Sequence, residues 1–310
     1  MANIDVLPSW RPGPTREALV GFLESAIALP IAERVAYFDN DGTLWCERPT
    51  YIQYDFFVDH LRTRVAAEPS LADRPEFQAV LAGDATAIGE LGLARIALAL
   101  AGLFEGLTAE TFDTLVRGFM ETATHAMLDR PLHTVVYQPM LELIDELRRL
   151  EFTVGIVTGG GTEFVRAVSA DLYGVPSELV VGTLVDYEFG RDADGRPIAR
   201  RTARVLGDAN EGPAKVTNIQ TQLGRRPILA AGNSRGDAEM LEWAGAGGQP
   251  GLALLIDHDD ADREFAYVSR AETIDSSEEI TATARRLGWT VVSMADDWDH
   301  VFAPVGMERA

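Results

Sequence analysis

The chain has 310 residues, of which 46% are hydrophobic, and its formal net charge is −21. This length and composition allow a sizeable buried core in one large domain or two. The acidic charge argues against a nucleic-acid partner or an anionic membrane partner, and the single cysteine, Cys46, excludes an intramolecular disulfide. The sequence shows no signal peptide and no run of eighteen apolar residues, so we expect a cytoplasmic protein without a membrane partner.

The first predicted elements are a helix over residues 14–29 and a short buried strand over 35–38. The strand stops at Asp39-Asn40-Asp41-Gly42, whose composition is typical of a turn. Two acids, Asp39 and Asp41, therefore stand two positions apart where a strand ends. In an open α/β sheet, ligands bind outside the carboxyl ends of the strands. Taken alone, the motif is equally compatible with an ordinary surface turn.

Residues 47–130 have a different hydrophobic pattern from the segment before them. Apolar residues recur there at helical spacing, and no strand-like run interrupts them. The segment is long enough to fold as a small domain. We therefore predict a helical cap domain over 47–130, inserted into a discontinuous core formed by 1–46 and 131–310.

After Pro131, predicted helices and strands alternate to the end of the chain. This alternation is typical of a mostly parallel sheet with right-handed crossovers. We therefore predict an α/β fold with a Rossmann-like core. The predicted strands are 152–157, 179–185, 227–231, 252–256 and 289–292, with a hairpin tip at 191–197 and helices over 140–150, 163–172, 212–223, from 237, and over 278–287.

Four polar motifs fall at the ends of predicted strands or at a helix start. They are Asp39-x-Asp41-Gly42-Thr43, Thr158-Gly159-Gly160, Lys215, and Gly232-Asn233-x3-Asp237. In order, residue types and spacing they resemble the haloacid dehalogenase superfamily of phosphohydrolases with an aspartate nucleophile. The helical insertion after the first motif resembles the phosphoserine-phosphatase-like branch in particular. The resemblance covers about 35–46 and 131–257.

The resemblance implies a role for each motif, and the chemistry suits the residues. Asp39 would attack phosphorus to form an aspartyl-phosphate, and Asp41 would protonate the leaving oxygen and then activate water. Thr158 and the backbone N–H groups of Gly159 and Gly160 would hold phosphate oxygens. Lys215 would neutralise developing charge. It is the only lysine among 27 basic residues and falls where the motif needs one.

The resemblance also implies Mg²⁺ held by Asp39, the Asp41 carbonyl, Asn233 and Asp237. Magnesium prefers oxygen ligands of these kinds. The sequence departs from the commonest family pattern at Asn233, because an aspartate is usual at that position. Asparagine still offers a carbonyl oxygen. Asn233 and Asp237 could also be turn and helix-cap residues without a metal.

The residues that follow the first motif are the candidates for binding the substrate. Phosphoserine enzymes place a carboxylate shortly after the first motif. When this chain is aligned with them without gaps, that position is occupied by Arg48, and Glu47 lies one residue earlier. Trp45 and nearby aromatic residues either pack the cap against the core or form a cage for a quaternary ammonium, as in phosphocholine. His258, within Asp257-His258-Asp259-Asp260, is predicted to lie in a solvated loop.

Together these features predict a Mg²⁺-dependent phosphomonoesterase acting on a small-molecule phosphate ester. Asp41 argues against carbon–halogen cleavage, which in this superfamily lacks the second acid. A phosphotransferase or phosphomutase of the same superfamily remains an alternative. A second alternative is a catalytically silent, phosphate-binding regulator that keeps the fold.

Overall fold

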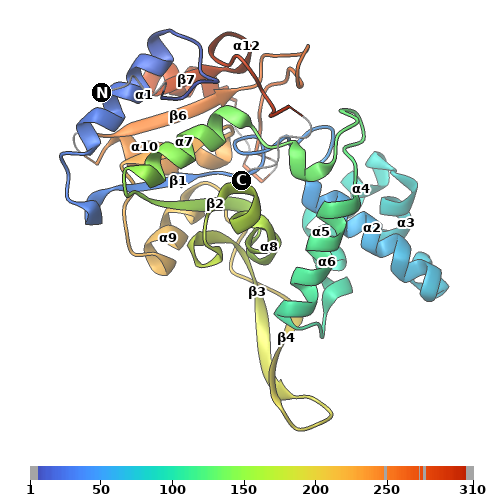
Figure 1. Ribbon diagram of the computed structural model, residues 1–310. Coiled ribbons are helices and arrows are strands. Elements are labelled where there is room, and N and C mark those ends of the chain that lie inside the picture. The colour runs from blue at the N-terminus through green and yellow to red at the C-terminus, as the bar shows by residue number, and fades with distance from the viewer. Residues whose placement is uncertain (1–5, 248–249, 272, 275–276, 305–310) are drawn as a thin grey trace.

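A computed structural model describes residues 6–247, 250–271, 273–274 and 277–304. The described residues form a seven-stranded sheet with the strand order β4-β3-β2-β1-β5-β6-β7 (Figure 1). Neighbouring strands are parallel except for the antiparallel pair β3–β4. The α/β fold with a mostly parallel sheet is therefore confirmed. The strands are β1 (Val35–Phe38), β2 (Thr153–Gly161), β3 (Val180–Arg191), β4 (Pro197–Leu206), β5 (Leu229–Gly232), β6 (Leu252–Asp257) and β7 (Thr290–Ser293).

Strand β1 lies at the centre of the sheet, and all four of its residues are buried. Its last residue, Phe38, is level with Ile156 of β2 and with Ala231 of β5. Because the three strands are parallel, their carboxyl ends meet at one edge of the sheet. This register brings the segments after Phe38, after Val157 and after Gly232 together, although they are far apart in the sequence.

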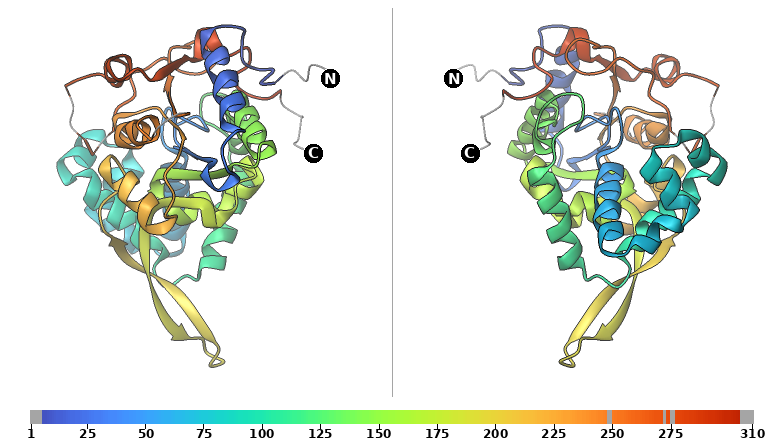
Figure 2. Two further views of the ribbon diagram at one scale, coloured as in Figure 1. Left: turned by 90° about the vertical axis from the view of Figure 1, so that its left-hand side faces the viewer. Right: turned by 90° about the vertical axis from the view of Figure 1, so that its right-hand side faces the viewer.

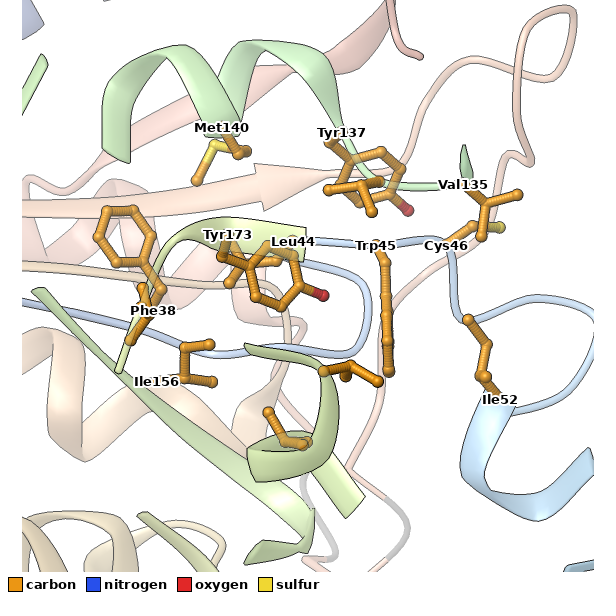
Figure 3. Packing of buried hydrophobic residues seen from close by; sticks show 14 of the residues in the cluster. Phe38, Leu44, Trp45, Cys46, Ile52, Val135, Tyr137, Met140, Ile156 and Tyr173 are labelled. Carbon is orange, nitrogen blue, oxygen red and sulfur yellow. The ribbon is translucent and has the colours of Figure 1, made fainter. Parts of the chain in front are cut away.

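Helices cover both faces of the sheet, as a parallel sheet requires. Alternate residues of β1 face different hydrophobic clusters, with Phe38 in one and Tyr37 in the other. Figure 3 shows the first cluster, where Phe38, Leu44, Met140 and Tyr173 pack together. The helices outside residues 47–130 are α1 (Pro14–Ala26), α7 (Gln138–Arg149), α8 (Thr162–Tyr173), α9 (Pro213–Gln222), α10 (Ala238–Gly245), α11 (Ile280–Leu287) and α12 (Met294–Asp297).

The predicted insertion after the first motif is helical. It contains α2 (Ile52–Ala67), α3 (Pro75–Ala82), α4 (Ala85–Leu91), α5 (Leu93–Ala101) and α6 (Ala109–Thr122), and these helices gather at one side of the sheet (Figure 1). Phe56 and Phe104 stack within it, with ring centroids 5.2 Å apart. Whether residues 47–130 form an independent domain stays a prediction.

Strands β3 and β4 form a long hairpin that projects beyond the rest of the molecule in every view (Figures 1 and 2). The predicted strand ends at residue 185, whereas β3 continues to Arg191 because β4 pairs with it. Midway along the paired strands, where Arg201 lies opposite Tyr187, the hairpin binds the helical insertion. Gly106 N donates to Arg201 O at 2.8 Å, and Arg201 N donates to Leu107 O at 2.8 Å. The Arg201 guanidinium lies over the Phe112 ring at 4.1 Å and pairs with Glu163 of α8.

Among the described residues, no single helix is both long and apolar enough to cross a membrane. Helix α4 and the segment Leu93–Phe104 reach the required length only together, and they are bent by 93° relative to each other.

Candidate active site

The centre of the site is a buried triad of one ammonium and two carboxylates. Lys215 Nζ lies 2.5 Å from Asp39 Oδ1 and 2.6 Å from Asp237 Oδ1, and it also donates to the Val157 carbonyl at 2.8 Å. Asp39 directly follows β1, and Lys215 lies in the first turn of α9. The structure thus brings together three of the predicted motifs, and all three side chains of the triad are buried.

The charges of the triad depend on one another. Burial and the neighbouring Asp237 raise the pKa of Asp39 well above its ordinary value, while Lys215 opposes this. Burial alone would lower the pKa of Lys215, but the Asp237 and Asp39 carboxylates raise it, so the ammonium stays charged. Its two carboxylates share a single positive charge inside the protein. A further cation or an anionic substrate entering here would therefore change the balance strongly.

Asp41 has a separate set of partners. Its Oδ1 accepts a hydrogen bond from Trp45 Nε1 at 2.8 Å, and its Oδ2 lies 3.5 Å from Thr158 Oγ1. Burial raises the pKa of Asp41, and the hydrogen bond from Trp45 is the largest opposing effect. A carboxyl group with a raised pKa can hold a proton for a leaving group. The two acids of the first motif thus lie in different environments.

The second motif is part of β2, which extends past the predicted end at residue 157 to Gly161 and leads directly into α8. Gly160 N donates to Thr158 Oγ1 at 2.9 Å, and Gly161, the residue before α8, donates its N–H to Gln53 Oε1 at 2.9 Å. Thr183 Oγ1 donates to Gly159 O at 2.8 Å, and Asn210 Nδ2 donates to Thr158 O at 2.9 Å. Backbone N–H groups at a helix start can bind phosphate oxygens.

The sequence analysis missed Gln53. This residue lies in the first turn of α2, within the helical insertion, and its side chain contacts Gly161 at the end of β2, next to the predicted phosphate-binding residues. A Cβ atom on Gly160 would lie 2.7 Å from Gln53 Oε1. Gln53 lies near the start of the predicted helical segment, and nothing in the sequence distinguishes it from the other polar residues there.

The last motif forms a tight loop after β5. Asp237 Oδ2 accepts hydrogen bonds from the backbone N–H groups of Asn233 and Ser234, at 3.0 and 2.9 Å. Its other oxygen binds Lys215. Both oxygens of Asp237 are therefore engaged within the protein. This arrangement gives Asp237 a structural role in the loop and at Lys215, whether or not it also contacts a metal.

The resemblance implies a Mg²⁺ ion, and the oxygen atoms of the site fit such an ion. Within the described part of the chain, no group of three or more His, Cys, Asp or Glu side chains could hold a metal. Of the four predicted donors, Asp237 has both carboxylate oxygens engaged within the protein. The other three do not depend on such a group, because they combine the Asp39 carboxylate with the Asp41 carbonyl and the Asn233 amide oxygen. No described residue donates a hydrogen bond to either of these last two oxygens. The donor set consists of oxygens and so fits Mg²⁺.

The three predicted substrate-binding residues after the first motif lie in different surroundings. Trp45 has no exposed surface, packs against Phe164 and Tyr173, and donates a hydrogen bond from Nε1 to Asp41. Glu47 is buried, and its Oε1 accepts from Asn233 Nδ2 at 3.1 Å. Arg48 is partly exposed and lies over the Tyr267 ring at 4.3 Å.

The prediction that His258 lies in a solvated loop is wrong. Its side chain is buried, and its Nε2 lies 2.8 Å from the Gly42 carbonyl while its Nδ1 lies 3.3 Å from Glu264 Oε2. The ring also stacks on Tyr267, with centroids 4.4 Å apart. The loop after β6 folds back onto the first motif and covers the polar side chains there. The run of acids around His258 has the composition of an exposed loop, which is why the sequence gives no sign of this packing.

Comparison with known proteins supports the predicted superfamily. The chain matches the family model of haloacid dehalogenase-like hydrolases over residues 36–242. Three solved structures are similar to it. A Bordetella pertussis Tohama I protein of unknown function is 19% identical, with a TM-score of 0.52, covering 84% of this chain and 98% of that one.

The second is a haloacid dehalogenase family hydrolase from Salmonella enterica serovar Typhi, 15% identical, with a TM-score of 0.41, covering 84% of this chain and 77% of that one. The third is a phosphoserine phosphatase with a phospho-aspartyl intermediate analogue, 18% identical, with a TM-score of 0.36, covering 72% of this chain and 86% of that one. The likeness to the Bordetella pertussis protein, at 19% identity and a TM-score of 0.52, shows a shared fold alone. No curated protein matches the chain significantly in sequence.

The family match spans the first motif, the Thr158-Gly159-Gly160 motif, Lys215 and the loop around Asn233. It covers more than half of the chain and coincides with the segments that the sheet brings to one edge. The predicted superfamily is therefore confirmed, and the chain belongs to the haloacid dehalogenase-like hydrolases.

Proposed function

We propose that this protein is a Mg²⁺-dependent phosphomonoesterase of the phosphoserine-phosphatase-like branch, which hydrolyses a small-molecule phosphate ester through an aspartyl-phosphate on Asp39. The family supports a hydrolase of the phosphatase type. The observation that supports an aspartyl-phosphate mechanism is that the two acids of the first motif have different partners. Asp39 is paired with Lys215, whereas Asp41 is held by Trp45 and Thr158.

In the proposed reaction, an Asp39 carboxylate oxygen attacks phosphorus and the bond to the ester oxygen breaks. Asp41 gives its proton to the departing alcohol, and then takes a proton from the water that cleaves the aspartyl-phosphate. Lys215 stabilises negative charge on Asp39 and on the phosphoryl oxygens, while Thr158 and the following N–H groups orient those oxygens. A magnesium ion held by Asp39, the Asp41 carbonyl and Asn233 would neutralise phosphate charge when bound.

The helical segment 47–130 is proposed as the cap that closes over the substrate and limits the entry of water. Gln53 supports this, because it already reaches from α2 to the carboxyl end of β2. Arg48 and Glu47, at the start of the same segment, are proposed to lie near the group that the phosphate ester carries. The net charge of −21 supports a small substrate and argues against nucleic acid as the partner.

The proposal is tested by measuring phosphate release from a panel of phosphate monoesters, with Mg²⁺ and with EDTA. Asp39→Asn should lower the rate about a thousandfold or more, because the amide is not a nucleophile. Asp194→Asn, at the exposed hairpin tip, is the matched control and should leave the rate unchanged. Undiminished release in Asp39→Asn would overturn the nucleophile assignment. Inactivity of the wild type across the panel would favour a phosphotransferase, a mutase or a silent phosphate-binding regulator.

A further inference from the structure

Glu47 and Asn233 form a buried contact beside the proposed metal donors. Asn233 Nδ2 donates to Glu47 Oε1 at 3.1 Å, with Ser269 Oγ as a second acceptor at 3.4 Å. Asn233 is 2% exposed and Glu47 is 7% exposed. Both residues are therefore held inside the protein, and neither can be reoriented without disturbing its neighbours.

The carboxylate of Glu47 is itself fixed from another segment. Tyr267 OH donates to the same oxygen, Oε1, at 2.7 Å. The Tyr267 ring stacks on His258, and His258 in turn binds the Gly42 carbonyl at 2.8 Å. The position of Glu47 is thus set by the loop after β6 as well as by its own place after the first motif.

This contact decides which way the Asn233 amide faces. An asparagine side chain carries its donor nitrogen and its acceptor oxygen on opposite sides, and a carboxylate can only accept. Because Glu47 accepts a hydrogen bond from Asn233 Nδ2, Asn233 Oδ1 must point away from Glu47. No described residue donates a hydrogen bond to Asn233 Oδ1. Gly42 keeps the arrangement close, since its φ is +73° and a Cβ there would lie 1.9 Å from Asn233 Nδ2.

We propose that Glu47 is a positioning residue that turns the Asn233 amide so that its oxygen serves as a metal ligand. The inference rests on the metal site of the proposed function and deepens it. An asparagine at this position binds a metal only through Oδ1, whereas an aspartate would bind with either oxygen. An amide ligand therefore needs an orienting partner that an aspartate does not. Glu47 supplies that partner.

The test measures binding of Mn²⁺ to the full chain after EDTA treatment, by calorimetry and by electron paramagnetic resonance, so that the readout does not depend on turnover. Glu47→Ala should weaken Mn²⁺ binding about 10- to 100-fold, the usual effect of removing a group that orients a metal ligand. Tyr267→Phe removes a hydrogen bond that helps to fix Glu47 but leaves the Asn233 contact, so it should weaken Mn²⁺ binding less than Glu47→Ala does. Asp194→Asn, at the exposed hairpin tip, is the control and should leave the affinity unchanged. A thermal melt in EDTA shows whether each variant is folded.

A reciprocal exchange gives a second measurement that does not depend on the alanine variant. Asn233→Asp alone places two carboxylates 3.1 Å apart and should gain little affinity despite the added ligand charge. Adding Glu47→Gln supplies an amide donor to the new aspartate. The double variant should therefore bind Mn²⁺ at least as tightly as wild type. Its binding should also be tighter than the sum of the binding free-energy changes of Asn233→Asp and Glu47→Gln predicts.

The outcomes separate this inference from the proposed function. Mn²⁺ binding that is unchanged in folded Glu47→Ala, with a raised KM for the ester, would overturn the positioning role and leave Glu47 as a substrate contact. Absence of Mn²⁺ binding in the wild type would overturn both the metal dependence and this inference. Weakened binding in the Glu47 variants of a chain that hydrolyses no ester would support the inference while the proposed function fails.

Discussion

Lys215 Nζ lies 2.5 Å from Asp39 Oδ1, across 176 residues of sequence, with both side chains buried. The same nitrogen lies 2.6 Å from Asp237 Oδ1. A buried ion pair of this kind contributes less than its geometry suggests, because both ions lose their hydration. Removing one partner is strongly destabilising, because the remaining charge stays buried without a counter-ion.

Lys215→Met should therefore destabilise the fold as well as abolish activity. Two carboxylates would remain buried without their cation, and breaking a buried pair in this way costs about 3–5 kcal/mol. The free energy of unfolding, measured by urea denaturation in EDTA at pH 7, checks this. Arg196→Ala, which removes an exposed cation at the hairpin tip, should change it by less than about 0.5 kcal/mol. A loss below about 1 kcal/mol in Lys215→Met would contradict the buried triad.

The hydrogen bond from Trp45 to Asp41 should be visible in the pH dependence of the proposed reaction. The indole N–H stabilises the ionised carboxylate and so lowers the pKa of Asp41, against the effect of burial. Trp45→Phe removes this donor, so the pKa should rise and Asp41 should stay protonated to higher pH. The alkaline limb of kcat/KM, which reports loss of the acid, should then move to higher pH.

The control for that variant is Phe164→Leu, which disturbs the packing around the Trp45 ring but keeps its N–H. Its alkaline limb should stay at the wild-type position even if the melting temperature falls. If both variants shift the limb equally, packing and not the hydrogen bond sets the behaviour of Asp41.

Much of the site could be predicted from the sequence because its motifs are local. Asp39, Thr158 and Asn233 lie where a buried apolar run gives way to turn residues, and parallel strands bring such points to one edge of the sheet. Lys215 stood out because the chain contains no other lysine. Family membership and the α/β fold followed from these features.

The contacts that the sequence does not reveal are those made by tertiary packing. Gln53 reaches Gly161 only because the start of α2 lies beside the carboxyl end of β2, and nothing in the neighbouring sequence signals this. His258 is surrounded by acids in sequence yet is buried against Gly42. Trp45 follows the first motif at a position typical of a substrate contact, yet its side chain is fully buried. Each case depends on which surfaces meet, and periodicity and spacing do not contain that information.

Gln53 should compete with phosphate for the N–H of Gly161. The amide oxygen accepts this N–H at 2.9 Å, so a phosphate oxygen that binds there must replace it. Gln53→Ala should therefore lower the inhibition constant of inorganic phosphate about 2- to 10-fold, as expected for one hydrogen bond worth roughly 0.5–1.5 kcal/mol. Inhibition kinetics with a monoester substrate measure this. Thr50→Ala, which changes an exposed hydrogen bond to Asp55 at the start of the same helix, should have no effect. A raised constant would show that the Gln53 amide binds phosphate itself.

Glu264 should make stability depend on pH on the acid side. Burial would raise its pKa, but hydrogen bonds from His258 and from the Phe265 N–H lower the pKa below its usual value of 4.5. The folded state thus holds the ionised form more firmly than the unfolded chain does. The stabilisation is fully present above pH 4.5 and is lost as the pH falls through the lower, folded-state value.

Glu264→Gln removes this titration, so its free energy of unfolding should fall less steeply than that of wild type between pH 5 and the acid limit. Urea denaturation at a series of pH values measures the two slopes, and the variant should already be less stable at pH 7 because Tyr137 OH and His258 lose a charged acceptor. Glu151→Gln, at an exposed carboxylate paired only at 3.9 Å with Arg34, serves as the control and should follow the wild-type curve. Parallel curves for wild type and Glu264→Gln would show that this carboxylate is not preferentially ionised in the folded protein.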